Sequence, residues 1–195
     1  MSDFSIFFPM GIEHITDLNG LDHILFITAL CMRYLISDWK KLLILVTAFT
    51  IGHSITLALS TLNIISLPQR WTEFFIALTI VITAFNNWFV KDFTFKTRYP
   101  AIYFFALFFG LIHGLGFANY IRFMLAKGQG LGWSLFGFNV GLEAGQVVVV
   151  LCILLVSYLA VDRFKLNRKW WVWVLSAAAF CIAFKMAIDR WPLAT

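Results

Sequence analysis

Several side chains that bind metals or carry protons lie within or beside apolar stretches of this chain, where an ionisable group is expensive. They are His14, Asp22, His23, His53, His113 and Glu143. All four histidines of the chain belong to this set. Imidazole and carboxylate together are ligands for first-row divalent metals, with zinc, nickel, cobalt and iron as candidates. The sequence therefore predicts a buried metal site.

The spacing of the polar residues around Glu143 predicts how they lie on a helix. Asn139, Glu143 and Gln146 stand at i, i+4 and i+7, so they form one polar stripe on a helix. Three glycines repeat every four residues on the roughly opposite face: Gly137, Gly141 and Gly145. Such a ridge of small residues lets a neighbouring helix approach closely. We expect Asn139, Gln146, Ser54 and Glu73 to hold the metal ligands in place by hydrogen bonds.

The composition shows what kind of chain must position these groups. Hydrophobic residues make up 61% and charged residues 13% of the 195 residues, and the mean hydropathy is +0.85. Soluble domains average about 45–50% apolar and about 25% charged residues. A soluble enzyme, a disordered chain and a secreted disulfide scaffold are therefore excluded. The net charge of +5 comes from short clusters between apolar runs, which favours contact with lipid headgroups over nucleic acid.

Six apolar runs are candidates for membrane-spanning helices, which need about 20 residues. They cover residues 21–36, 42–62, 71–90, 99–124, 131–161 and 170–188. The first run is short, and the segment 7–18 before it either extends it or lies in the membrane interface. No internal repeat or long linker divides the chain. We therefore expect one all-α domain over residues 1–195, a bundle of six transmembrane helices.

The distribution of basic residues predicts the orientation. Ten Lys and Arg residues lie in the first, third and fifth connections, and five lie on the opposite side. Because cytoplasmic loops carry the excess of positive charge, both termini are expected outside the cytoplasm. Asp22 and His23 then open the first helix on the outer side.

Three interpretations of the buried polar groups stay open at this point. A single intramembrane histidine can serve as a hydrogen-bonding link between helices. Three histidines and two or three carboxylates at similar depth favour a metal site. A proton relay uses the same residue types.

Four motifs, together with the upstream His14, resemble the HupE/UreJ family of small bacterial membrane proteins. They read GLDHILF at residues 20–26, FTIGHSITL at 49–57, GLIHGLGFA at 110–118 and FNVGLEAGQ at 138–146. The resemblance spans roughly residues 11–150. Members encoded with hydrogenase and urease accessory genes are regarded as nickel permeases. The resemblance thus implies a six-helix permease-like protein of the bacterial cytoplasmic membrane.

The sequence departs from the nickel-linked branch of that family at two places. His14 lies farther upstream of the Asp22-His23 pair than the pattern expects. Gly116-Phe117 stands where a second His-Gly pair would begin. The chain is therefore more similar to the second, less characterised branch, and the metal is nickel, zinc or another divalent ion.

Two mechanisms and a structural role follow from these residues. In a permease, Glu13, His14, Asp17, Asp22 and His23 would collect the ion and His53, His113 and Glu143 would bind it at mid-membrane. In an intramembrane metal-dependent hydrolase acting on a lipid or a membrane peptide, Glu143 would be the general base. In a scaffold or assembly factor, the polar residues would only specify packing. We favour the permease, with the bilayer and a divalent metal ion as partners and a homo-oligomer left open.

Overall fold

The computed structural model describes residues 3–18, 20–90, 101–125 and 130–193, without the side chains of residues 119, 120, 122, 124 and 125. Among these residues every regular element is a helix, as the sequence predicts. The α-helices are α1 (Asp3–Thr16), α2 (Asp22–Cys31), α3 (Trp39–Thr61), α4 (Gln69–Asn87), α5 (Ile102–Leu125), α6 (Leu131–Ser157) and α7 (Arg168–Asp189). A short 3₁₀ helix, Ile36–Asp38, leads into α3, and a π-helical turn, Tyr158–Arg163, continues α6.

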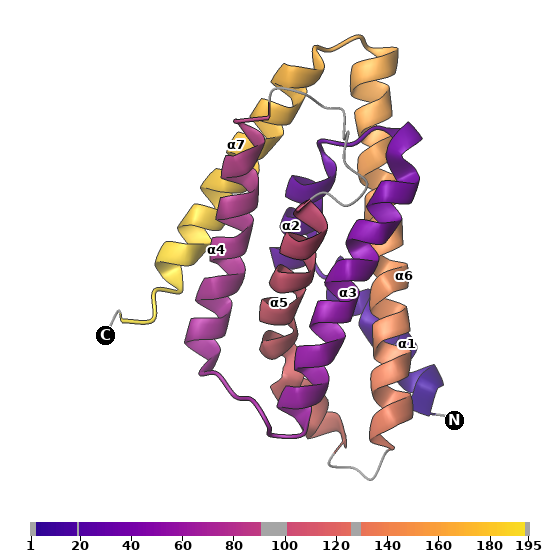
Figure 1. Cartoon of the computed structure of the whole chain (residues 1–195), viewed down its shortest axis with the longest axis vertical. Coiled ribbons are helices and arrows are strands. Elements are labelled where there is room, and N and C mark those ends of the chain that lie inside the picture. Colours follow the sequence, from indigo (N-terminus) through magenta and orange to yellow (C-terminus); the bar gives the residue numbers. More distant parts are fainter. Residues whose placement is uncertain (1–2, 19, 91–100, 126–129, 194–195) are drawn as a thin grey trace.

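The helices from α3 to α7 run roughly along one axis, and each runs in the opposite direction to the one before it in the chain (Figure 1). In the part of the chain that the structure describes, three helical stretches are long and apolar enough to cross a membrane: Ile36–Thr61, Leu131–Arg163 and Arg168–Asp189. The helices Asp22–Cys31 and Ile102–Ala118 are apolar but shorter. Both chain ends lie in the lower half of the bundle (Figure 1). Lys91, Lys96, Arg98 and Lys127, which contribute to the predicted orientation, lie outside the described residues, as do the first residues of the predicted helix 99–124.

The predicted first helix, residues 21–36, is wrong in its length. Within it, α2 covers 10 residues, and a separate helix of 14 residues, α1, precedes it. Asp17 and Gly20 lie between them, with the Gly20 amide donating to the Asp17 carbonyl oxygen at 3.3 Å. Asp and Gly favour turns over helix interiors, which explains the interruption. The segment 7–18 thus belongs mostly to a helix of its own, which packs on α6 rather than extending α2.

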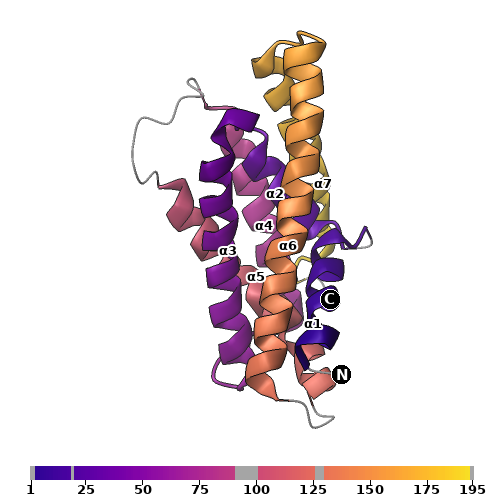
Figure 2. The ribbon, with the colours of Figure 1, turned by 90° about the vertical axis from the view of Figure 1, so that its right-hand side faces the viewer.

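Glycines bring α1 against α6, as the repeat at 137, 141 and 145 predicts. A Cβ on Gly137 or Gly145 would press on the backbone of Phe4 or Ile12, and one on Gly141 would overlap the Phe8 carbonyl oxygen. The two helices lie side by side over the length of α1 (Figure 2). The glycine prediction is confirmed, and its partner is α1.

A second close pair joins α3 and α5. A Cβ on Gly110 would overlap the Phe49 carbonyl oxygen, and one on Gly114 would overlap that of His53. From the other side, a Cβ on Gly52 would overlap the Leu107 carbonyl oxygen. These pairs, α1 with α6 and α3 with α5, make the most extensive helix contacts in the described chain. Each pair carries at least one of the histidines.

Candidate metal centre

Three histidines from three helices meet inside the bundle. His14 lies in the last turns of α1, His23 is the second residue of α2, and His53 lies in the middle of α3. One ring nitrogen of each lies within 4.8 Å of a ring nitrogen of the others. His23 and His53 are buried, and His14 is half-buried. We call these three residues the histidine cluster.

The spacing of the histidine cluster is close to that of a metal site. Nitrogens bound to one zinc ion lie about 2.0–2.1 Å from it, so in tetrahedral geometry they stand about 3.4 Å apart. Because the ring nitrogens of the histidine cluster lie within 4.8 Å of one another, they need to approach by up to about 1.4 Å to bind a single ion. The break between α1 and α2 places His14 and His23 on separate helices, with ring centres 4.5 Å apart.

His113 stands beside the histidine cluster. Its ring centre lies 5.2 Å from that of His23. Its Nε2 shares a hydrogen bond of 3.1 Å with the Thr79 hydroxyl on α4. The remaining nitrogen, Nδ1, is thereby left to face other partners. A hydrogen bond at one ring nitrogen fixes the orientation of the ring and leaves the other nitrogen for a metal.

The ring nitrogens of the four histidines are poorly satisfied. Five of them are buried and make no hydrogen bond: His14 Nε2, His23 Nε2, both nitrogens of His53, and His113 Nδ1. Leaving a buried polar atom without a partner costs about 1–3 kcal/mol. If these residues only joined helices by hydrogen bonds, their nitrogens would be paired. Their arrangement instead suits an ion that several imidazoles share.

Aromatic rings form the wall around the imidazoles. The Phe117 ring centre lies 4.0 Å from that of His14 in a tilted arrangement, and Phe117 stacks on Phe138 at 4.9 Å. The Phe49 ring centre lies 5.1 Å from that of His113. Phe26 and Phe49 are fully buried with Phe138 in the main hydrophobic core. These rings exclude water from the buried His23, His53 and His113, which strengthens any electrostatic interaction made there.

A pocket of about 610 Å³ leads to His14 from the surface. Its lining includes the carboxylates of Glu13 and Asp17, both on exposed residues, together with His14 and Phe117. Carboxylates at a mouth raise the local concentration of cations. The structure thus brings three of the five predicted collecting residues, Glu13, His14 and Asp17, to one opening.

The structure does not place Asp22 in the histidine cluster, although its neighbour His23 is there. Both carboxylate oxygens of Asp22 accept hydrogen bonds from Arg190, at 2.8 and 3.3 Å. This bidentate pair joins the start of α2 to the end of α7. Its side chains are 16% and 26% exposed, so water screens it only in part.

We expect the substitution Arg190→Gln to destabilise the protein more than it weakens metal binding. It removes a charge-assisted pair that contributes about 1.5–3 kcal/mol, and the Asp22 carboxylate is not part of the histidine cluster. Thermal unfolding in detergent measures the first effect and metal titration the second. The double exchange Asp22→Arg with Arg190→Asp should recover part of the stability. A metal affinity that falls as far as it does on loss of His53 would instead make Asp22 a ligand.

Two residues of the polar stripe, Glu143 and Gln146, bond threonines of α3 outside the histidine cluster, whereas the third, Asn139, lies beside the His53 ring. The Thr47 hydroxyl donates to Glu143 Oε1 at 2.6 Å, and the Thr50 hydroxyl donates to Gln146 Oε1 at 2.8 Å. Asn139 donates to the Leu135 carbonyl oxygen at 2.8 Å, and its own Oδ1 is buried without a partner. Among the described residues, no carboxylate joins the three clustered histidines.

The two remaining predicted residues lie apart from the ring nitrogens. The Ser54 hydroxyl donates to the Thr50 carbonyl oxygen one turn back, at 2.7 Å. Glu73 accepts a hydrogen bond of 2.7 Å from Gln69 in the first turns of α4. Neither contact touches a histidine, and their supporting role stays a prediction.

Sequence reasoning missed Thr79, Thr47 and the role of Arg190. Threonines in a helix often bond a carbonyl one turn back, so nothing in the sequence distinguishes Thr79, which contacts His113, from Thr83, which bonds the Thr79 carbonyl oxygen. The sequence indicates only that Arg190 is a positively charged residue near the end of the last helix. Its partner is 168 positions away.

The fold and the site together define a class: a helical membrane protein with a histidine cluster inside its bundle and an acidic pocket beside it. The particular family follows from the sequence as a whole. The chain belongs to the HupE/UreJ family, because the family described as HupE / UreJ protein matches residues 1–191. The family resemblance is confirmed, and it extends through α7, beyond the four motifs. No curated protein and no solved structure matches the chain.

Proposed function

We propose that this protein is a divalent-metal permease of the nickel type in the bacterial cytoplasmic membrane. The observation that carries the proposal is the set of buried, unsatisfied imidazole nitrogens in and beside the histidine cluster. The family membership supports it, since the HupE/UreJ family is associated with nickel and metal transport. Imidazole ligands without a thiolate bind a divalent ion firmly enough to replace its water and weakly enough to release it.

In this proposal the chain crosses the membrane six times, with α1 and α2 together making the first crossing and both termini outside. The alternating direction of the helices and the position of both chain ends in the lower half of the bundle support this count (Figure 1). Helices interrupted at a substrate site are a recurring device of transporters. Here the interruption lies between His14 and His23.

A route for the ion follows from the order of polar groups along α3. The acidic pocket at Glu13 and Asp17 receives the ion from outside, and the histidine cluster binds it. From His53, Thr50 and Thr47 lie toward the Lys40 end of α3, which the charge bias assigns to the cytoplasm. Six residues of helix cover about 9 Å. The hydrogen-bonded oxygens of the threonines, Glu143 and Gln146 thus continue the polar route inward.

The substitution Glu143→Gln tests this route. Glutamine retains an oxygen that can accept the Thr47 hydrogen bond, so folding should persist while the negative charge is lost. We expect uptake of Ni²⁺ or Zn²⁺ into reconstituted vesicles to fall at least about tenfold, with weaker metal binding, because the cation loses the Glu143 carboxylate on the inward route. The double change Glu143→Gln with Gln146→Glu, which moves the carboxylate by about one turn, is the matched control for charge.

Vesicle uptake also separates the permease from its alternatives. A Glu143→Gln protein that keeps its metal as tightly as the wild type but loses hydrolysis of a lipid or peptide would establish the hydrolase. If wild-type vesicles showed neither metal uptake nor histidine-dependent metal binding, the scaffold role would be the remaining interpretation. The structure gives the hydrolase less support, because the Glu143 carboxylate bonds Thr47 rather than facing the histidine cluster.

A further inference from the structure

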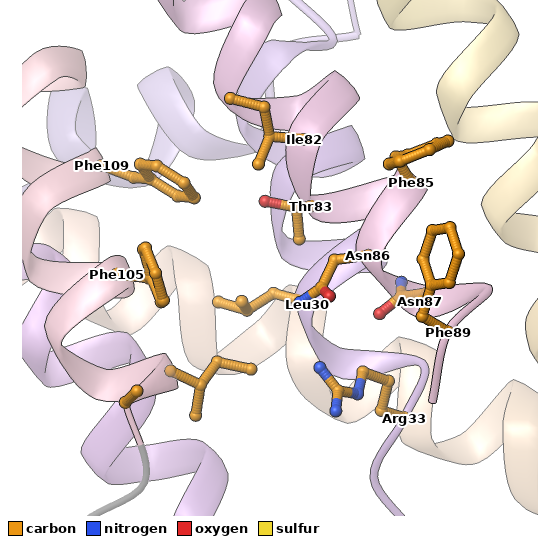
Figure 3. Close-up of a pocket in the computed structure, with 12 residues that line it drawn as sticks. Leu30, Arg33, Ile82, Thr83, Phe85, Asn86, Asn87, Phe89, Phe105 and Phe109 are labelled. Atoms are coloured by element: carbon orange, nitrogen blue, oxygen red, sulfur yellow. The ribbon is translucent and has the colours of Figure 1, made fainter. Parts of the chain in front are cut away.

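A second cavity lies between α2, α4 and α5, near the end of α2 and α4 and the start of α5. It encloses about 610 Å³, within the range of about 300–1,000 Å³ typical of small-molecule sites. Leu30 comes from the end of α2, Arg33 from the turn after it, Thr83 and Asn87 from α4, and Phe109 from α5 (Figure 3). None of the described residues that line it is a histidine or a carboxylate, so it does not belong to the proposed metal route.

One end of this cavity is polar and incompletely satisfied. Asn87 is 1% exposed, and its amide nitrogen donates to the Ala29 carbonyl oxygen at 2.7 Å. Its amide oxygen is buried without a hydrogen-bond partner. Figure 3 shows this oxygen on the side of Asn87 that faces the Arg33 guanidinium. An occupant of this end therefore meets a cation and a buried acceptor side by side.

The rest of the cavity is apolar and continues onto the outer surface of the bundle. Phe105 and Phe109 form one wall, and Ile82 and Phe85 lie on the other (Figure 3). Phe85 is 47% and Phe105 56% exposed. In a membrane, such exposed rings contact hydrocarbon, so the cavity opens toward the lipid chains rather than toward water.

We propose that this cavity binds one phospholipid whose headgroup carries a hydrogen-bond donor, such as phosphatidylglycerol or phosphatidylethanolamine. The phosphate binds the Arg33 guanidinium, whose planar donors match phosphate oxygens. The headgroup hydroxyl or ammonium donates to the Asn87 amide oxygen. One acyl chain lies between the phenylalanines of α4 and α5. The inference does not depend on metal transport.

The position of the cavity supports a lipid from the leaflet with the basic residues. Arg33 belongs to the first connection, which also contains Lys40 and Lys41, and Arg168 at the start of α7 donates to the Arg33 carbonyl oxygen at 2.6 Å. Basic residues at a membrane surface attract anionic headgroups. Because the Arg168 contact uses the backbone of Arg33, a change of the Arg33 side chain leaves it in place.

Native mass spectrometry of the detergent-purified full chain tests the proposal. We expect about one retained phospholipid per wild-type chain. Arg33→Gln should lower the affinity for added dioleoyl phosphatidylglycerol by about tenfold or more, since a charge-assisted contact is lost. Arg163→Gln, which changes an exposed arginine at the same end, should match the wild type. Ile82→Trp should also reduce retention, because it fills the cavity without touching Arg33.

The choice of lipid tests the headgroup assignment. Dioleoyl phosphatidylcholine has the phosphate but no headgroup donor for Asn87, so we expect it to bind several-fold more weakly than phosphatidylglycerol or phosphatidylethanolamine. Equal binding of all three lipids would overturn the assigned headgroup. Retention unchanged in both Arg33→Gln and Ile82→Trp, with both proteins monodisperse, would overturn the site.

Discussion

Replacing His53 with alanine should abolish high-affinity metal binding while the protein still folds and inserts. His53 is fully buried, and neither of its ring nitrogens makes a hydrogen bond. Its removal therefore costs the fold little beyond a weak contact with the Asn139 side chain, but it takes away one of the three clustered imidazoles. Loss of an outer-shell contact alone weakens metal binding by about 10–100-fold. We expect the loss of a direct ligand to exceed about 100-fold in Kd, as measured by titration with Ni²⁺ and Zn²⁺.

Ser54→Ala is the matched control for this substitution. It changes the next residue of α3, whose hydroxyl is already bonded to the Thr50 carbonyl oxygen, and it should leave the metal affinity within about twofold. His113→Ala should give an intermediate loss, because His113 stands beside the histidine cluster rather than in it. Wild-type affinity in a well-folded His53→Ala protein would refute the metal site and leave the histidines as packing residues.

The sequence predicts the helical class and the chemistry of the site because both leave local signals. Apolar runs show where the helices are, and ionisable residues within such runs stand out by their cost. His14, His23, His53 and His113 are all the histidines of the chain, and the structure gathers them in one place. The glycine repeat at 137, 141 and 145 likewise predicts a close helix partner, which the structure identifies as α1.

What the sequence does not predict depends on contacts between distant residues. Asp22 and His23 are neighbours in the chain, yet the carboxylate pairs with Arg190 while the imidazole joins the histidine cluster. Successive residues of a helix point about 100° apart, so adjacency alone cannot assign them to one site. Glu143 shows the same limit, since its stripe predicts a polar face but not that Thr47 lies opposite.

The two glycine-mediated helix pairs explain how the site is assembled. Gly114 of α5 follows His113 in the chain and lies against the backbone of His53. This one contact therefore sets the distance between the imidazoles of His113 and His53. Gly141 of α6 lies against Phe8 of α1, the helix that carries His14. Without a hydrophobic force between helices in lipid, such close backbone packing is what holds them together. The geometry of the histidines therefore depends on residues that touch no metal.

Gly141→Ala should consequently weaken both stability and metal binding. Its new Cβ would overlap the Phe8 carbonyl oxygen, a rigid backbone atom, so α1 must move away from α6 and take His14 with it. Overpacking of this kind costs about 1–3 kcal/mol. Thermal unfolding should show this loss, and metal titration should show a Kd raised by about tenfold or more, because one of the three clustered imidazoles leaves its place.

Gly132→Ala provides the control on the same helix. Nothing lies within 4 Å of a Cβ at this position, and alanine favours a helix over glycine by about 1 kcal/mol. We expect this protein to be as stable as the wild type or slightly more so, with unchanged metal affinity. If Gly141→Ala behaved like Gly132→Ala in both measurements, the close contact of α1 with α6 would not control the site. If it lost stability but kept its metal affinity, His14 would not be a ligand, and the site would depend on the α3–α5 pair and His23.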